Sequence, residues 1–155
     1  MRHQPGVAIG LVKSVDDPSG EGRIQLTYPW LEASMVSSWA PIAAPLAGAK
    51  HGAWLMPEVD DEVLVAFDHG DFSHPYVIGF LFNGVDKPFE TEKKNRVIRS
   101  PGGHELRFED SDSAKKVIVK SNGGLTITLD DAGESIEIKG GGRTVTMKGG
   151  EVKIT

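Results

Sequence analysis

The sequence predicts an all-β protein, and three observations carry this prediction. Apolar and polar residues alternate with period two through the last third of the chain, from His104 to Thr155. Glycine-rich or acidic turns separate the alternating stretches, and 19 of the 155 residues are glycine. Almost no stretch shows the 3.6-residue period of an amphipathic helix. The class is therefore all-β, with a repetitive array of short strands at its end.

In this array, every second residue is apolar and its neighbours are mostly charged residues or threonine. Such strands present one dry face and one wet face. The residues predicted to form the dry face are Leu106, Phe108, Val117, Val119, Leu125, Ile127, Leu129, Ile136, Ile138, Val145 and Met147.

The sequence offers nothing within the array to cover this dry face. A bare sheet of this size would exceed the roughly 300–600 Å² apolar patch found on monomers. Either the strands fold back onto the N-terminal part as one monomeric domain, or identical chains cover one another. The connections are too short to turn back, which favours copies. Three ribbons around one axis would bury the alternate residues as an intertwined trimeric β-helix or β-prism with few free edges.

Composition excludes several classes of protein. The formal net charge is −5, and residues 1–103 carry 9 basic and 13 acidic side chains, so no basic stripe suggests a nucleic-acid partner. Without cysteine, neither disulfides nor thiolate metal sites can form. Residues 1–5 lack the apolar core of a signal peptide, and no apolar run is long enough for a membrane span. We therefore expect assembly in the cytoplasm.

The N-terminal part predicts five strands in a small OB-like Greek-key barrel. A loop of small residues at 45–52 separates the third strand from the fourth, and a polar linker at 84–94 follows the fifth. The expected domains are thus a barrel with its linker at 1–94 and a spike-like ladder at 95–155. The predicted strands are Val7–Val15, Arg23–Tyr28, Ser37–Ala43, Glu62–Phe67 and Tyr76–Phe82.

One cluster has the residue types of a metal site: Asp68, His69, Asp71 and His74, close behind the acidic run 60–62. The cluster lies where a hairpin must turn, and Asp and Gly suit turn geometry. The turn is the favoured interpretation, and no metal or other cofactor is expected.

A nucleic-acid site on the barrel would use aromatic side chains as stacking platforms, the candidates being Tyr28, Trp39, Phe67 and Phe72. Such a site needs a cationic groove, and this barrel is acidic, so core or interface roles are favoured. No nucleophile and base occur at a telling spacing, and Ser34, Ser37 and Ser38 have no matching histidine. No catalytic residue is assigned.

Several motifs resemble the OB-fold spike proteins of contractile tails, which include phage baseplate assembly protein V and the corresponding part of VgrG. Most specific is the block from Gly52 to Gly84, with its run Gly-Ala-Trp-Leu-Met-Pro-Glu-Val-Asp-Asp-Glu-Val-Leu-Val-Ala-Phe-Asp-His-Gly-Asp. Further matches are Asp17-Pro18, Gly22-Arg23, Pro29-Trp30 and the run 100–110. The resemblance spans nearly the whole chain. It implies a homotrimeric, non-enzymatic central spike that pierces a target membrane mechanically, as part of a phage tail or an extracellular injection particle.

Departures from the family pattern refine these expectations. Asp60 stands where the family usually has glycine. No hub domain precedes the barrel, which implies a separate hub protein, and no lysozyme-like insertion is present. The last strand lacks the His-x-His motif of some phage spikes, so a PAAR-type cone protein is expected to dock on Val152, Lys153, Ile154 and Thr155. The alternative function is an OB-fold binding module for nucleic acid or glycan.

Overall fold

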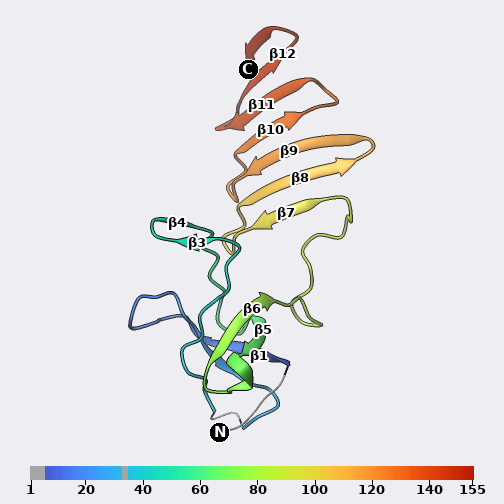
Figure 1. Ribbon diagram of the computed structural model, residues 1–155. Helices are drawn as coiled ribbons and strands as arrows, with labels where there is room; N and C mark the ends of the chain where they lie inside the picture. Colours follow the sequence, from blue (N-terminus) through green and yellow to red (C-terminus); the bar gives the residue numbers. More distant parts are fainter. Residues whose placement is uncertain (1–5, 33–34) are drawn as a thin grey trace. The chain divides into compact units, whose positions relative to one another are not determined.

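The computed structural model describes residues 6–32 and 35–155. Met1–Pro5 and Ser34, on which two of the expectations above fall, lie outside the described residues. The chain divides into two compact units, Met1–Lys87 and Pro88–Thr155. Figure 1 shows both units as strand structures, and the class is all-β as predicted.

The first unit is a small barrel built on a four-stranded antiparallel sheet in the order β2-β1-β5-β6. Its strands are β1 (Val7–Ser14), β2 (Gln25–Thr27), β5 (Glu62–Phe67) and β6 (Pro75–Phe80). Along β5, half-buried and buried residues alternate over the whole strand. This alternation confirms the predicted period-two pattern and directs Val63, Val65 and Phe67 into the core.

The predicted third strand, Ser37–Ala43, is wrong as a regular strand, although this segment closes the barrel. Ile24 and Ala40 exchange backbone hydrogen bonds of 3.0 and 2.8 Å on one side. On the other side, Val77 N donates to Pro41 O at 3.0 Å and Ala43 N donates to Val77 O at 2.8 Å. Pro41 has no N–H to donate, so the ladder breaks into isolated bridges around it.

The long connection between the third segment and β5 is also more structured than predicted. The small residues at 45–52 form a minimal hairpin of β3 (Ala47–Gly48) and β4 (His51–Gly52). Between β5 and β6, Asp68–Gly70 forms a single 3-10 turn. The sequence prediction of a turn at this place is confirmed.

The core of the first unit is apolar and closed. It consists of Val12, Ile24, Leu26, Tyr28, Ala40, Val63, Val65, Phe67 and Val77. Six of these residues are completely inaccessible to solvent: Ile24, Leu26, Ala40, Val63, Val65 and Val77.

The second unit is a seven-stranded antiparallel meander in which every strand pairs with its sequence neighbours. Its strands appear as successive rungs in Figure 1. They are β7 (Arg96–Arg99), β8 (Glu105–Ser111), β9 (Ala114–Lys120), β10 (Thr126–Asp130), β11 (Ser135–Gly140), β12 (Arg143–Lys148) and β13 (Glu151–Ile154). The predicted ladder is confirmed, and its first rung is β7, which lies before the alternation that begins at His104.

Candidate functional site

The apolar residues of the ladder line up across the rungs in two columns on one face. Residues directly opposite in antiparallel pairs share a face, so the register fixes these columns. The first column contains Ile98, Leu106, Val119, Ile127, Ile138, Val145 and Ile154. The second contains Phe108, Val117, Leu129, Ile136, Met147 and Val152.

This face is largely exposed in the single chain. Ile127, Ile136 and Ile138 are 42%, 39% and 42% exposed even in the middle of the ladder. Monomers rarely leave such a continuous apolar surface open to water. The face is therefore the strongest candidate interaction surface of the chain, and it contains the residues that the sequence assigned to the dry face.

Leu125 joins this face from outside the regular strands, since it immediately precedes β10. Its side chain lies over Gly140, where an added Cβ would come within 2.8 Å of Leu125 Cδ2. Glycine at position 140 thus leaves the space that Leu125 occupies. Together with Val119, Ile127, Ile138 and Val145, Leu125 lines a hollow on the apolar face.

The opposite face carries mainly charged residues and threonine, together with Val97 and Ile118, and several of its charges are paired within the chain. Lys116 Nζ lies 3.2 Å from Asp130 Oδ2, and Lys139 Nζ lies 2.7 Å from Glu137 Oε1. The pKa of Asp130 is lowered, first by a hydrogen bond from the Gly133 backbone and then by Lys116. This face suits contact with water.

A denser charge network holds the segment before β7 to the first rungs. Arg107 on β8 pairs with Glu90, and Arg99 on β7 pairs with Glu105, a buried carboxylate. The Arg99 guanidinium carbon also lies 4.4 Å from the centre of the Phe89 ring. Hydrogen bonds from the Glu92 backbone, from Asn95 and from Arg107 lower the pKa of Glu90 to about 2.

Sequence reasoning missed this network, because Glu90 lies in a segment that reads as a polar linker. A detectable signal for a strand at residues 96–99 was the pair of β-branched residues Val97 and Ile98 between two arginines.

The last rung, β13, has the most exposed apolar side chains of the ladder. Val152 and Ile154 are 65% and 70% exposed, and they continue the two apolar columns. Lys153 lies opposite Thr146 on the polar face, and Thr155 exchanges backbone hydrogen bonds with Thr144. Of the four residues proposed for tip docking, only two thus belong to the apolar face.

The acidic and histidine cluster near the end of β5 forms the predicted turn. His69 has a positive φ of 47°, and the Ser73 N–H donates to Asp71 Oδ1 at 2.9 Å. His74 Nδ1 lies 2.9 Å from Asp71 Oδ2. These hydrogen bonds, that of Ser73 first, lower the pKa of Asp71. Within residues 6–32 and 35–155, no three potential metal ligands come together.

The aromatic residues considered as stacking platforms mostly belong to the barrel core. Tyr28 and Phe67 are buried, and Phe72 packs on both with ring centres 5.1 and 5.3 Å away. Burial raises the pKa of Tyr28 to about 12. Trp39 is half-buried outside this cluster. The prediction of core roles is confirmed for Tyr28 and Phe67.

Asp17 organises the turn between β1 and β2. Its carboxylate accepts hydrogen bonds from the backbone N–H groups of Ser19, Glu21 and Arg23 at 3.0, 3.1 and 3.2 Å. Arg23 adds two side-chain hydrogen bonds of 3.0 Å each. These contacts, the Arg23 side chain above all, hold the pKa of Asp17 far below its usual range. The motif residues Asp17 and Arg23 thus have a structural role.

Among the described residues, no helix has the length and apolar character needed to cross a membrane.

Comparison with known proteins assigns both units. Residues 8–82 match the family model of the type VI secretion system/phage-baseplate injector OB domain. Residues 95–155 match the phage baseplate V C-terminal trimerisation domain. The first match covers the barrel and the second covers the complete ladder with its apolar face.

Relatives among characterised proteins point the same way. The type VI secretion system spike protein VgrG3 of Vibrio cholerae is 26% identical over 75% of this chain and 13% of its own length. The spike protein VgrG5 of Pseudomonas aeruginosa is 30% identical over 68% of this chain and 16% of its length. The actin cross-linking toxin VgrG1 of Vibrio cholerae is 27% identical over 74% of this chain and 12% of its own length. The chain thus spans less than a fifth of these relatives.

The two matched domains lie in the order that the resemblance implied, and together they cover most of the chain. The chain therefore belongs to the phage baseplate V and VgrG family of spike proteins.

Proposed function

We propose that this protein is the homotrimeric central spike of a contractile injection system or phage tail. The observation that carries the proposal is the pair of in-register apolar columns on the ladder, which lie in the segment matched by a trimerisation domain. Three such faces turned toward one axis remove the apolar side chains from water. Each buried apolar Å² contributes about 25 cal/mol to this association.

The hydrogen-bonding pattern suits a mechanical role. The five inner rungs are paired on both sides within their own chain, so three ladders associate through their faces and leave few unpaired strand edges. A rod of this kind carries load along its axis through many parallel backbone hydrogen bonds. Its task is to transmit the force of contraction and open a path through a target membrane, without catalysis by this chain.

Two further partners complete the proposal. In the first unit, Val7 and Ile9 of β1 and Leu46, which directly precedes β3, are 54%, 43% and 57% exposed, and a hub protein covers these residues. The exposed apolar side chains of β13, Val152 and Ile154, meet a cone-shaped PAAR-type protein. Both partners come from the family resemblance.

Light scattering of the purified protein tests the trimer. We expect a particle of three times the 16.7 kDa chain mass that persists on dilution to micromolar concentration. A stable monomer at this concentration contradicts the proposal. The spike role is tested by deleting residues 95–155 in the producing cell, which should leave contractile particles unassembled or unable to permeabilise target cells.

A further inference from the structure

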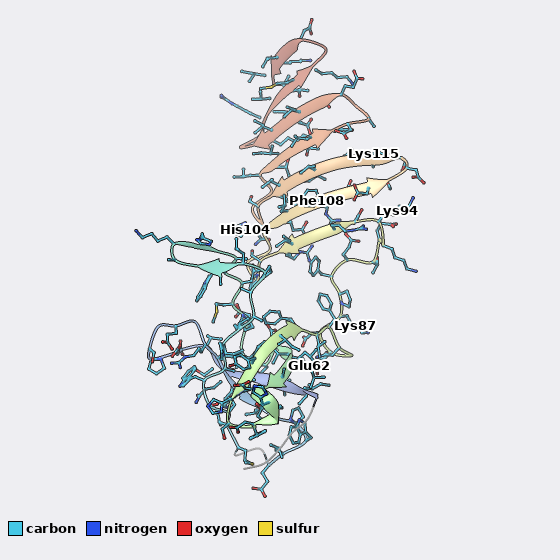
Figure 2. The ribbon with its side chains drawn as sticks, in the orientation of Figure 1. Glu62, Lys87, Lys94, His104, Phe108 and Lys115 are labelled. Carbon is cyan, nitrogen blue, oxygen red and sulfur yellow. The ribbon has the colours of Figure 1, made fainter. Side chains whose placement is uncertain are left out.

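The apolar face of the ladder has two edges that carry opposite charge. Continuing the alternation outward from the first column leads to His104 and Arg143, and outward from the second column to Asp110. The turn residues Asp131 and Glu134 lie at the same edge as Asp110, because they line a hollow with apolar residues of the second column. This edge also carries two lysines: Lys115 stands opposite Asp110 in the register, and Lys94 Nζ lies 2.8 Å from Asp112 Oδ2. Figure 2 shows His104 and Lys115 at opposite ends of the rungs.

Arg143, Asp131 and Glu134 are exposed, and within the described part of the chain they form no ion pair. The polar face differs, because its Lys116–Asp130 and Lys139–Glu137 pairs are made inside one chain. The edge charges thus remain available to a partner.

Each edge also borders a hollow of the apolar face. The hollow at the basic edge is lined by Arg143 together with Leu125, Ile138 and Val145. The hollow at the acidic edge is lined by Asp131 and Glu134 together with Ile136 and Met147, and Gly149 and Gly150 keep it free of side chains. A side chain that reaches over from a neighbouring ladder finds space at the acidic edge.

A cyclic trimer joins unlike edges. In a ring, each interface is heterologous, so the basic edge of one ladder meets the acidic edge of the next at all three corners. Arg143 begins β12 and Glu134 directly precedes β11, the adjacent rung. With equivalent rungs at equal height, the two side chains are offset by one strand spacing of about 4.8 Å, which an arginine spans.

We propose that Arg143 of one protomer pairs with Glu134 and Asp131 of the next at each corner of the trimer, and that this pairing sets the direction of assembly. Turning one ladder upside down with its apolar face still inward exchanges its edges. Arginine would then face arginine at one corner, and the acidic residues would face each other at another. The charges therefore select parallel ladders, in addition to the apolar burial that drives association. This inference rests on the proposed homotrimer.

Charge exchange in the full-length protein tests the pairing. Arg143→Glu places three acidic residues at each corner and should raise the dissociation constant of the trimer by at least about tenfold. Glu134→Arg should weaken the trimer as well. The double variant Arg143→Glu/Glu134→Arg restores opposite charges and should recover most of the loss. Lys153→Glu is the matched control, since it makes the same charge change on the polar face and should have little effect.

Analytical ultracentrifugation over a dilution series in low salt gives the dissociation constants, and circular dichroism reports folding. Recovery in the double variant supports the pairing even if a single variant fails to assemble. The corner pairing is wrong, and the trimer itself is not in question, in either of two cases. In the first, the trimer of Arg143→Glu has no higher dissociation constant than that of Lys153→Glu. In the second, the double variant has no lower dissociation constant than the single variants. A monomeric wild-type protein overturns the proposed function itself.

Discussion

The barrel and the ladder use the same period-two sequence pattern with opposite results. In the barrel, Ile24, Leu26 and Val65 are completely buried within one chain. In the ladder, equivalent apolar residues such as Ile127 and Ile138 stay 42% exposed, and Glu105 is the one buried residue of residues 88–155.

The difference lies in where the apolar surface is covered. The barrel closes its sheet with residues 36–43, so its apolar core is buried within one chain. The ladder completes its backbone hydrogen bonds with its own rungs but has no second layer. A folding unit needs two packed layers around a core. The ladder therefore takes its second layer from other copies.

The change expected to break the ladder most severely is Ile127→Asp. Ile127 lies opposite Ile138 at the middle of the first column, and three copies of the substitution would place three carboxylates near one axis. Each uncompensated buried charge costs about 3–5 kcal/mol. We expect loss of the trimer in light scattering. Thr128→Asp places the same side chain on the polar face and should leave the trimer intact; equal loss in both variants would mean that the faces are assigned wrongly.

The fragment of residues 1–94 separates the two regions directly. It contains the complete barrel core and lacks the ladder, so we expect a folded monomer with a cooperative thermal transition. Circular dichroism and light scattering on the same sample measure both properties. A fragment as firmly trimeric as the whole chain would show that the barrel, and not the ladder, organises the assembly.

Sequence reasoning predicted the ladder well because its signal is local. Seven short rungs with tight turns repeat one pattern, and each rung pairs with its sequence neighbour, so alternation alone specifies register and faces. The same reasoning located the turn at Asp68–Asp71, where the residue types match the required geometry.

Features that depend on distant contacts were predicted less well. Pro41 and its neighbours form isolated bridges to β2 and β6, and the sequence does not reveal that this segment meets both. The charges of Glu90 and Arg107 are 17 positions apart in sequence, and only the fold brings them together. The opposite charge of the two ladder edges became visible only from the structure, where the register places Arg143 beside the apolar face and Glu134 lines a hollow of that face.

The Asp17–Arg23 turn offers a test confined to the barrel. A carboxylate whose pKa is depressed by folding contributes stability above its unfolded pKa, about 3.9 for Asp. The contribution is lost as the pH falls toward the lower pKa of the folded state. We therefore expect Asp17→Asn to lower the urea midpoint of barrel unfolding at pH 7, with the gap to wild type closing below about pH 4.

Asp16→Asn is the control for this change, because the Asp16 carboxylate accepts no hydrogen bond in the described structure. It should leave the midpoint almost unchanged at both pH values. A gap between Asp17→Asn and wild type that stays constant from pH 7 to pH 3 would show that the carboxylate charge is not what stabilises the turn.

The smallest expected effect concerns Asp60, the position at which the chain departs from the glycine of its family. Asp60 has a φ of 75°, in the left-handed region that costs an L-residue roughly 1–2 kcal/mol. Glycine removes this strain but adds about 0.4–1 kcal/mol of unfolded-state entropy. Asp60→Gly should therefore stabilise the barrel by about 0.5 kcal/mol. Asp60→Ala keeps the Cβ and should give no gain, so thermal unfolding of the two variants separates backbone strain from loss of the carboxylate. Equal stabilisation by alanine and glycine would assign the effect to the acidic run at 60–62 and not to the backbone.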